Sequence, residues 1–411
     1  MLVDSHAYCF EPLDSRAGHA DADEHLRWVQ AAHAHHHQPA WRVDDRAAAS
    51  SQLLAPEGRL DLSRLPEVGL RLDCERGRVI WTLDGQDYTK QFLPPNLRDL
   101  EFTPHSLIAE MDYAGVDYAL IHTDPMLGRD SAYLARCVGL YPDRLRAMAP
   151  VDEWRIAEAP EAVIEETVSA VVERGLHAVK FNACLAYMGG PEAWDDGPYR
   201  PFWEVVAELG VPVFFTLGIG RAGLTGRSLS PAEQRDGYLA EQRILVRWME
   251  RYPQTVCSLT HGFPWRALLD ANQIRMPEEI WAPFESPRCS LEVSFPVRLG
   301  DIFDYPYREI WPTLQEMVER IGADRLLWGS DMPFQNRFCT YRQSRGWIET
   351  YCDFLTDGDL AQIMGGTAAR ILGLEASSRN ADGPVRPGLA DHHRPIESKS
   401  PESGCAQETP A

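Results

Sequence analysis

Short apolar runs alternate with amphipathic stretches of helical length through residues 100–375, and this pattern most constrains the fold. Including one run at the start of the chain, the strand candidates are residues 2–3, 116–122, 145–151, 178–182, 211–216, 256–260, 290–295 and 326–328. Helical periodicity occupies residues 160–175, 199–210 and 231–252. Alternating strands and helices predict a parallel α/β fold, and eight units predict a (β/α)8 TIM barrel whose chemistry lies at the C-terminal ends of the strands.

Two regions depart from this alternation. Residues 9–100 are too long for an ordinary loop, so we expect an insertion after the first strand that caps the barrel mouth. Within it, Asp84-Gly85 separates two strand-like runs and predicts a hairpin. We therefore expect one barrel domain over residues 1–375, including the cap at 9–100, and a disordered tail at 376–411, where proline, glycine and charged residues replace the apolar periodicity.

Composition limits the partners. Asp and Glu number 61 against 40 Lys and Arg, and the formal charge of -21 argues against nucleic acid or an anionic membrane surface. No apolar run approaches the ~20 residues of a membrane span, and the first residues lack a leader-like pattern. The 9 cysteines are scattered without a CxxC pair, which favours reduced thiols. These features predict a cytoplasmic protein with a small-molecule substrate.

Ionisable residues lie at the ends of three predicted strands. Asp4, His6 and Tyr8 are spaced by two in the first strand and would share a face. His261 follows the sixth strand and Asp331 the eighth. His6 alone could equally be a hydrogen-bonded core histidine, but the joint pattern favours either a Zn or Mn site or an acid/base set.

Several motifs in this order resemble the amidohydrolase superfamily, in its aminocarboxymuconate-semialdehyde decarboxylase-like branch. The resemblance covers most of residues 1–375 and implies the same barrel. The motifs are Asp4-Ser5-His6, Met111-Asp112-Tyr113-Ala114-Gly115-Val116-Asp117, Tyr141-Pro142-Asp143-Arg144-Leu145, Gly175-Leu176-His177-Ala178-Val179-Lys180, Pro212-Val213-Phe214-Phe215, Thr260-His261-Gly262, Leu327-Trp328-Gly329-Ser330-Asp331-Met332-Pro333 and the closing segment 365–373.

The resemblance also implies a metal-ligand pattern from which this chain departs. Metal-dependent members carry His-x-His on the first strand, a histidine on the fifth, a histidine on the sixth and an aspartate on the eighth. Here Tyr8 and Thr216 occupy two of the ligand positions, which leaves His6 and Asp331 as a short ligand set for zinc. Two alternatives follow: other residues complete a Zn or Mn site, or the enzyme works without metal, as lactonases similar to this branch do.

Further residues are candidates for substrate binding. His33 and His37 are four apart in a helix-compatible part of the insertion and would share a face, as a metal pair, an anion site or a solvated surface. Lys180, in the fourth strand, can face substrate or pair structurally with Glu292. Arg221 follows Gly218-Ile219-Gly220 and has the planar fork that suits a carboxylate. Thr216 and Trp265 complete this set at the fifth and sixth strand ends.

The resulting hypothesis is a hydrolase of a small carboxylated or cyclic amide, lactone or related substrate. Asp331 would take a proton from the attacking water and His261 would polarise the carbonyl or donate a proton. His6 would hold a metal or a substrate oxygen, and Tyr8 would bind the oxyanion. The alternatives are non-oxidative decarboxylation of an aromatic or unsaturated acid, and a catalytically silent barrel retained for binding. Family resemblance also implies a homodimer.

Overall fold

Eight parallel strands form one sheet in the computed structural model, which describes residues 1–55, 60–220, 223 and 229–374. In spatial order they are β1 (Val3–Ala7), β7 (Tyr118–Ile121), β8 (Leu145–Ala149), β9 (Ala178–Asn182), β10 (Val213–Thr216), β11 (Cys257–Leu259), β14 (Cys289–Val293) and β15 (Leu326–Trp328). A parallel bridge between Ala7 and Met332, just beyond β15, joins the first strand to the last. The predicted TIM barrel is therefore confirmed.

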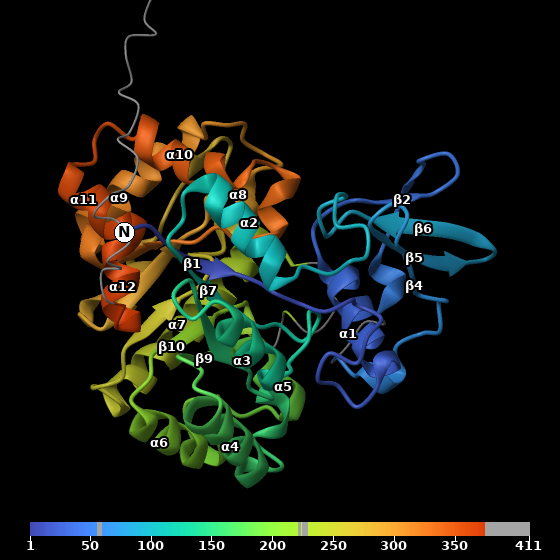
Figure 1. Ribbon diagram of the computed structural model, residues 1–411, viewed down its shortest axis with the longest axis horizontal. Coiled ribbons are helices and arrows are strands. Elements are labelled where there is room, and N and C mark those ends of the chain that lie inside the picture. Colours follow the sequence, from blue (N-terminus) through green and yellow to red (C-terminus); the bar gives the residue numbers. More distant parts are fainter. Residues whose placement is uncertain (56–59, 221–222, 224–228, 375–411) are drawn as a thin grey trace, which may run out of the picture. The chain divides into compact units, whose positions relative to one another are not determined.

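Helices connect the strands and pack around them (Figure 1). They are α2 (Pro104–Ala114), α3 (Ser131–Leu140), α4 (Pro160–Val168), α5 (Ala183–Gly189), α6 (Arg200–Leu209), α7 (Pro231–Arg251), α8 (Phe295–Leu299), α9 (Trp311–Ile321), α10 (Tyr341–Tyr351), α11 (Asp357–Ala361) and α12 (Thr367–Leu372). Among the described residues, no helix has the length and apolar character that crossing a membrane requires. The predicted tail at 376–411 lies outside the described residues.

Local sequence signals account for many element boundaries. Thr103 caps α2 by accepting from Ser106 N, and Gly115 ends that helix with a φ of 72°. A glycine suits this left-handed position because it has no Cβ. The stretch predicted as one helix over 160–175 is instead α4 followed by a wider turn over Ser169–Glu173. Most strand ends shift by at most two residues, but the first strand continues to Ala7, four residues beyond its expected end.

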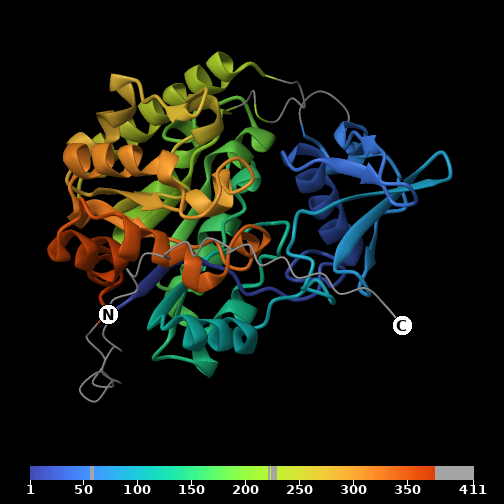
Figure 2. The same cartoon turned by 90° about the horizontal axis from the view of Figure 1, so that it is seen from above.

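The insertion forms a small sheet of its own beside a helix. Its strands are β2 (Ala40–Arg42), β3 (Ala48–Ala49), β4 (Arg71–Asp73), β5 (Arg78–Leu83) and β6 (Gln86–Lys90), in the order β3-β2-β6-β5-β4. Leu83 pairs with Gln86 across Asp84-Gly85, which confirms the hairpin. Helix α1 (Ala22–His35) buries Ala31 and Ala34 in a core shared with Trp81 of β5. Figure 2 shows α1 and the strands as one blue group.

Contacts of the insertion with the barrel involve loops that follow the C-terminal ends of strands. Its base is a bridge between Phe10 and Phe102, whose backbones exchange hydrogen bonds of 2.9 and 3.0 Å. His25 Nε2 lies 2.9 Å from the carbonyl of Met126, in the loop after β7. The rings of Phe92 and Phe334, the latter after β15, have centroids 5.5 Å apart. The insertion therefore contacts loops at this end of the barrel, and the cap over the mouth stays a prediction.

Asp4 connects the first and last strands at the barrel seam. Its buried carboxylate accepts hydrogen bonds from Ser330 N at 2.9 Å, from Tyr341 OH at 2.6 Å and from the Ser330 hydroxyl. We expect Asp4→Asn to lower the free energy of unfolding by about 1–3 kcal/mol, because the new amide N–H groups cannot accept these hydrogen bonds. Urea denaturation measures the loss, with the exposed Asp353→Asn as control. Equal stability of the two variants would contradict the seam role.

Candidate active site

His6 on β1 is the centre of a buried cluster at the C-terminal ends of the strands. Its Nδ1 lies 2.8 Å from Glu292 Oε2, and its Nε2 lies 2.9 Å from the Tyr8 hydroxyl and 3.2 Å from Asp331 Oδ1. His6 and Tyr8 thus come together as their spacing predicted. Asp4 does not join their contact, because the register of β1 shifts between Asp4 and Ala7 and its carboxylate bonds at the seam.

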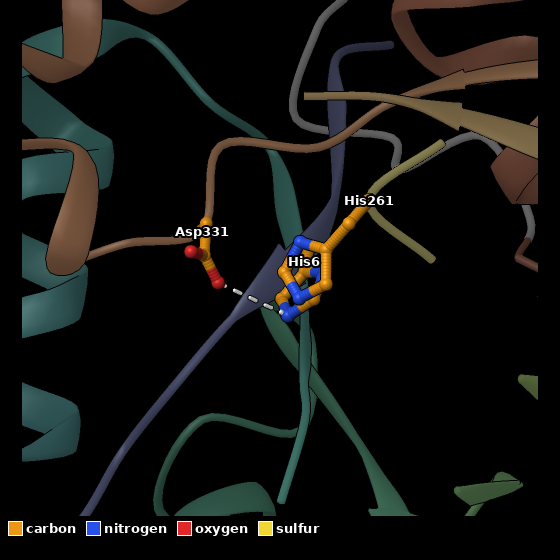
Figure 3. A group of neighbouring side chains, drawn as sticks. All are labelled: His6, His261 and Asp331. Atoms are coloured by element: carbon orange, nitrogen blue, oxygen red, sulfur yellow. Dashed lines mark ion pairs between the residues drawn. The ribbon is translucent and has the colours of Figure 1, made fainter. Parts of the chain in front are cut away.

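His261 and Asp331 both lie where the chain leaves a strand with unusual backbone geometry. Each has a φ of 63°, in the left-handed region that non-glycine residues rarely adopt. Surrounding contacts hold both turns: Asp331 N donates to the His6 carbonyl at 2.8 Å, and Trp265 Nε1 donates to the His261 carbonyl at 2.8 Å. Such backbone positions concentrate at functional sites, where they aim a side chain. Figure 3 shows both side chains converging on His6.

The donor atoms of His6, His261 and Asp331 lie within 4.8 Å of one another. Within the described part of the chain, His261 Nδ1, Glu292 Oε1 and Asp331 Oδ1 are buried without a hydrogen-bond partner. Buried polar atoms normally have hydrogen-bond partners, so a group of buried polar atoms without partners indicates a site for a ligand or ion. Two imidazoles and a carboxylate are a sufficient ligand set for catalytic zinc. His261 is thus the third ligand that His6 and Asp331 lacked in the sequence pattern. The residues therefore fit a divalent cation.

Glu292 on β14 orients His6 from behind. Its Oε2 accepts the hydrogen bond from His6 Nδ1, which leaves Nε2 as the nitrogen that faces Asp331. This packing depends on Gly329, because a Cβ there would lie 2.8 Å from the Glu292 carboxyl carbon. Burial raises the pKa of Glu292, and Ser294 and Lys180 oppose that shift.

A second polar chain extends from His6 across the barrel interior. The His122 ring stacks on His6 with centroids 3.6 Å apart. His122 Nε2 lies 2.8 Å from the Ser5 carbonyl, so it carries the proton, and Lys180 Nζ donates to Nδ1 at 3.1 Å. Lys180 also donates to Thr260 at 3.3 Å, and Thr260 lies 2.7 Å from Thr216. The alternative Lys180–Glu292 ion pair is not formed, because Glu292 pairs with His6 instead.

Burial controls the protonation of the cluster. Burial and nearby cations lower the pKa values of His6 and His261 well below their usual range, so both rings are neutral and can act as ligands. Burial, reinforced by the charge of Glu292, raises the pKa of Asp331 to about 7. Burial also lowers the pKa of Lys180, against the attraction of Glu292. Asp331 can therefore exchange a proton near neutral pH.

The remaining predicted residues are more dispersed. His33 Nδ1 lies 2.8 Å from the Val29 carbonyl, one turn earlier in the same helix. Because α1 ends at His35, His33 and His37 do not share a helical face. His37 Nε2 lies 3.8 Å from Asp301 of the barrel. Trp265 is buried and supports the His261 turn rather than facing an open site. Arg221 lies outside the described residues.

Other residues of the site carried no clear sequence signal. His122 and Glu292 stand in apolar runs, where the sequence alone gives His122 no functional signal and indicates Glu292 only as a structural partner of Lys180. Arg298 and Arg337 resemble ordinary surface arginines in the sequence, yet both act electrostatically on Asp331. Of these four residues, only Glu292 carried a sequence signal, which was a charged residue within a strand-like apolar run.

Glu153, near the end of β8, predicts a pH dependence of stability. It is buried, accepts from Asn182 N at 2.6 Å, and burial raises its pKa from 4.5 to about 8. Glu153 therefore binds its proton more tightly in the folded protein than in the unfolded chain. This difference stabilises the fold fully below pH 4.5, and the stabilisation is lost as the pH rises through about 8. In urea titrations at about pH 5.5 and 8.5, Glu153→Gln should flatten the decline seen in the parent protein. An unchanged decline would contradict this assignment.

Together, the barrel and the cluster define a TIM-barrel protein with an ionisable, metal-compatible centre at the C-terminal ends of its strands. A family model described as amidohydrolase matches residues 32–374. The chain belongs to this family of enzymes, which confirms the family predicted from its motifs.

Solved structures that resemble this chain include a probable 2-pyrone-4,6-dicarboxylic acid hydrolase from Acinetobacter baumannii, with 18% identity and a TM-score of 0.49, covering 67% of this chain and 90% of that one. Another is 2,6-dihydroxybenzoate decarboxylase from Rhizobium, with 19% identity, a TM-score of 0.49 and coverage of 67% and 90%. A dihydroxybenzoic acid decarboxylase from a Polaromonas species, solved with bound manganese, has 20% identity, a TM-score of 0.49 and coverage of 70% and 91%. A comparison with curated proteins found no match.

Proposed function

We propose that the protein is a hydrolase that directs water onto the carbonyl of a small carboxylated or cyclic amide or lactone. The observation that carries this proposal is the convergence of His6, His261 and Asp331 donor atoms within 4.8 Å at the strand ends. Nearby, Tyr8 places a hydroxyl 2.9 Å from His6 Nε2. A base, a neutral imidazole and a hydroxyl donor in one small volume are the parts that water attack on a carbonyl requires.

Each side chain has a role set by its surroundings. Asp331 accepts the proton of the attacking water, because burial holds its pKa at about 7. His261 faces the carbonyl oxygen or returns the proton to the leaving group, and Tyr8 donates to the developing oxyanion. Held by Glu292, His6 presents Nε2 to a metal or substrate oxygen. A bound Zn²⁺ or Mn²⁺, held by His6, His261 and Asp331, would supply a more acidic water and a polarised carbonyl.

Decarboxylation of an aromatic or unsaturated acid is the second candidate. It is favoured by the burial of the centre, where His6 and Glu292 side chains are 0% and 2% exposed. Loss of CO2 disperses the charge of a carboxylate, so a water-poor site lowers its barrier. Lys180 or Asp331 would then deliver a proton to carbon.

Oxygen and hydrogen isotopes separate the two reactions. The protein as purified would be offered a panel of lactones, cyclic amides and hydroxylated benzoates in H2¹⁸O and, separately, in D2O. Hydrolysis incorporates one ¹⁸O into the product acid and releases no CO2. Decarboxylation releases CO2 and places deuterium on carbon. Metal analysis of the same preparation, with Mn²⁺ and Zn²⁺ titrations of the His6→Ala variant, tests the metal site without relying on turnover. Incorporation of neither label across the panel would contradict both reactions.

A further inference from the structure

Three arginines lie on neighbouring segments that follow the C-terminal ends of strands. Arg298 lies on α8, directly after β14, and Arg337 lies in the turn after β15. Arg266, which follows β11, forms an ion pair with Asp301 and is thereby neutralised. Arg298 and Arg337 both interact electrostatically with Asp331, and the charge of each guanidinium lowers the pKa of its carboxyl group. Their charge is concentrated here although the whole chain carries -21.

Neither Arg298 nor Arg337 forms an ion pair with a carboxylate among the described residues. No carboxylate lies within the 4.0 Å of an ion pair from either guanidinium, and the described chain offers Arg298 no hydrogen bond. Arg337 Nε donates to the Phe334 carbonyl at 3.0 Å, but its Nη1 is buried without a partner. A buried charged donor without an acceptor lowers the stability of the folded protein, unless a ligand supplies the missing acceptor. If Asp331 is committed to a metal or to water, the two arginines lack their shared counter-charge.

Both arginines lie on segments that pack together beside the strand ends of the reaction centre. Helix α8, which carries Arg298, packs against the turn Phe334–Arg337 that follows Asp331 and against the turn Trp265–Leu268 that follows His261. The Arg337 guanidinium carbon lies 5.9 Å from the Phe92 ring and 6.0 Å from the Phe334 ring. Aromatic walls exclude water and strengthen a charged contact made between them.

We propose that Arg298 and Arg337 bind a non-reacting carboxylate of the substrate, while its reacting carbonyl lies among His6, His261 and Asp331. The inference rests on the proposed hydrolysis and narrows it to substrates that carry a second, anionic group and keep it in the product. Two planar guanidinium forks can hold one carboxylate through several charge-assisted hydrogen bonds. Phe92 and Phe334 lie beside this position, which suits the flat framework of an unsaturated or aromatic acid.

Equilibrium binding tests the anion site separately from turnover. The probes are isophthalate and its neutral, shape-matched diamide, measured by calorimetry on the protein as purified. We expect the wild-type protein to bind the diacid at least roughly tenfold more tightly than the diamide. Arg298→Gln and Arg337→Gln should each weaken diacid binding by roughly tenfold or more and leave diamide binding unchanged.

Two controls separate charge from structure. Arg275→Gln removes an exposed arginine that pairs with Asp270 on a surface hairpin, and should leave binding unchanged. Arg298→Lys keeps the charge without the planar fork, and should restore part of the affinity. Equal binding of diacid and diamide by the wild type, or unchanged diacid binding in both glutamine variants, would overturn the anion site. Neither result would affect hydrolysis, which the Asp331→Asn variant tests on its own.

Discussion

Replacing Asp331 by asparagine is expected to lower turnover at least ~100-fold, the usual scale for the loss of a general base. Asparagine keeps the shape of the side chain and removes the oxygen that accepts a proton. The effect should be large because Asp331 N is held by the His6 carbonyl at 2.8 Å, so the turn directs this one carboxylate at the centre. The carboxylate also serves as base whether or not a metal is bound.

Measurement of kcat with the substrate identified in the isotope panel checks this prediction. Asp353→Asn, an exposed aspartate on the same barrel, provides the matched control and should retain full turnover. Thermal unfolding of both variants shows whether the loss is chemical rather than structural. Survival of turnover within a few fold in Asp331→Asn would refute the proposed mechanism while leaving the barrel intact.

Glu292→Gln is expected to weaken metal binding by roughly 10–100-fold, with a matching loss of turnover. A neutral amide can still accept the hydrogen bond from His6 Nδ1, which spans 2.8 Å in the parent protein. The substitution therefore preserves the orientation of His6 and removes the negative charge that makes its Nε2 a stronger ligand. This separates a charge effect from a packing effect.

Titration with Mn²⁺ and Zn²⁺ measures the affinity directly, without substrate. Glu285→Gln, an exposed glutamate in the segment before β14, is the control and should bind metal as the parent protein does. The pH profile of turnover provides a second readout, because loss of the Glu292 charge should lower the pKa of Asp331, which that charge raises. Unchanged metal affinity and an unchanged profile would reduce Glu292 to a packing residue.

Much of the fold could be predicted because its information is local. Strand β9 (Ala178–Asn182) and strand β15 (Leu326–Trp328) have the bounds expected from apolar runs. The Asp84-Gly85 hairpin follows from backbone preferences of two residues, with φ values of 49° and 74°. Errors occurred where helix continuation depends on packing, as at Ser169–Glu173, and at α1, which ends before His37.

The sequence by itself determined the barrel, the strand ends that carry His6, His261 and Asp331, and the family. Periodicity and turn chemistry act over a few residues, and the barrel brings all strand ends to one rim. Only the tertiary structure decided which side chains meet there. His6 and Glu292 are 286 residues apart in the chain, and their contact requires strand order, register and the absence of a Cβ at Gly329. The same holds for Arg298 and Arg337, because only the surrounding residues in space show whether an arginine has an ion-pair partner.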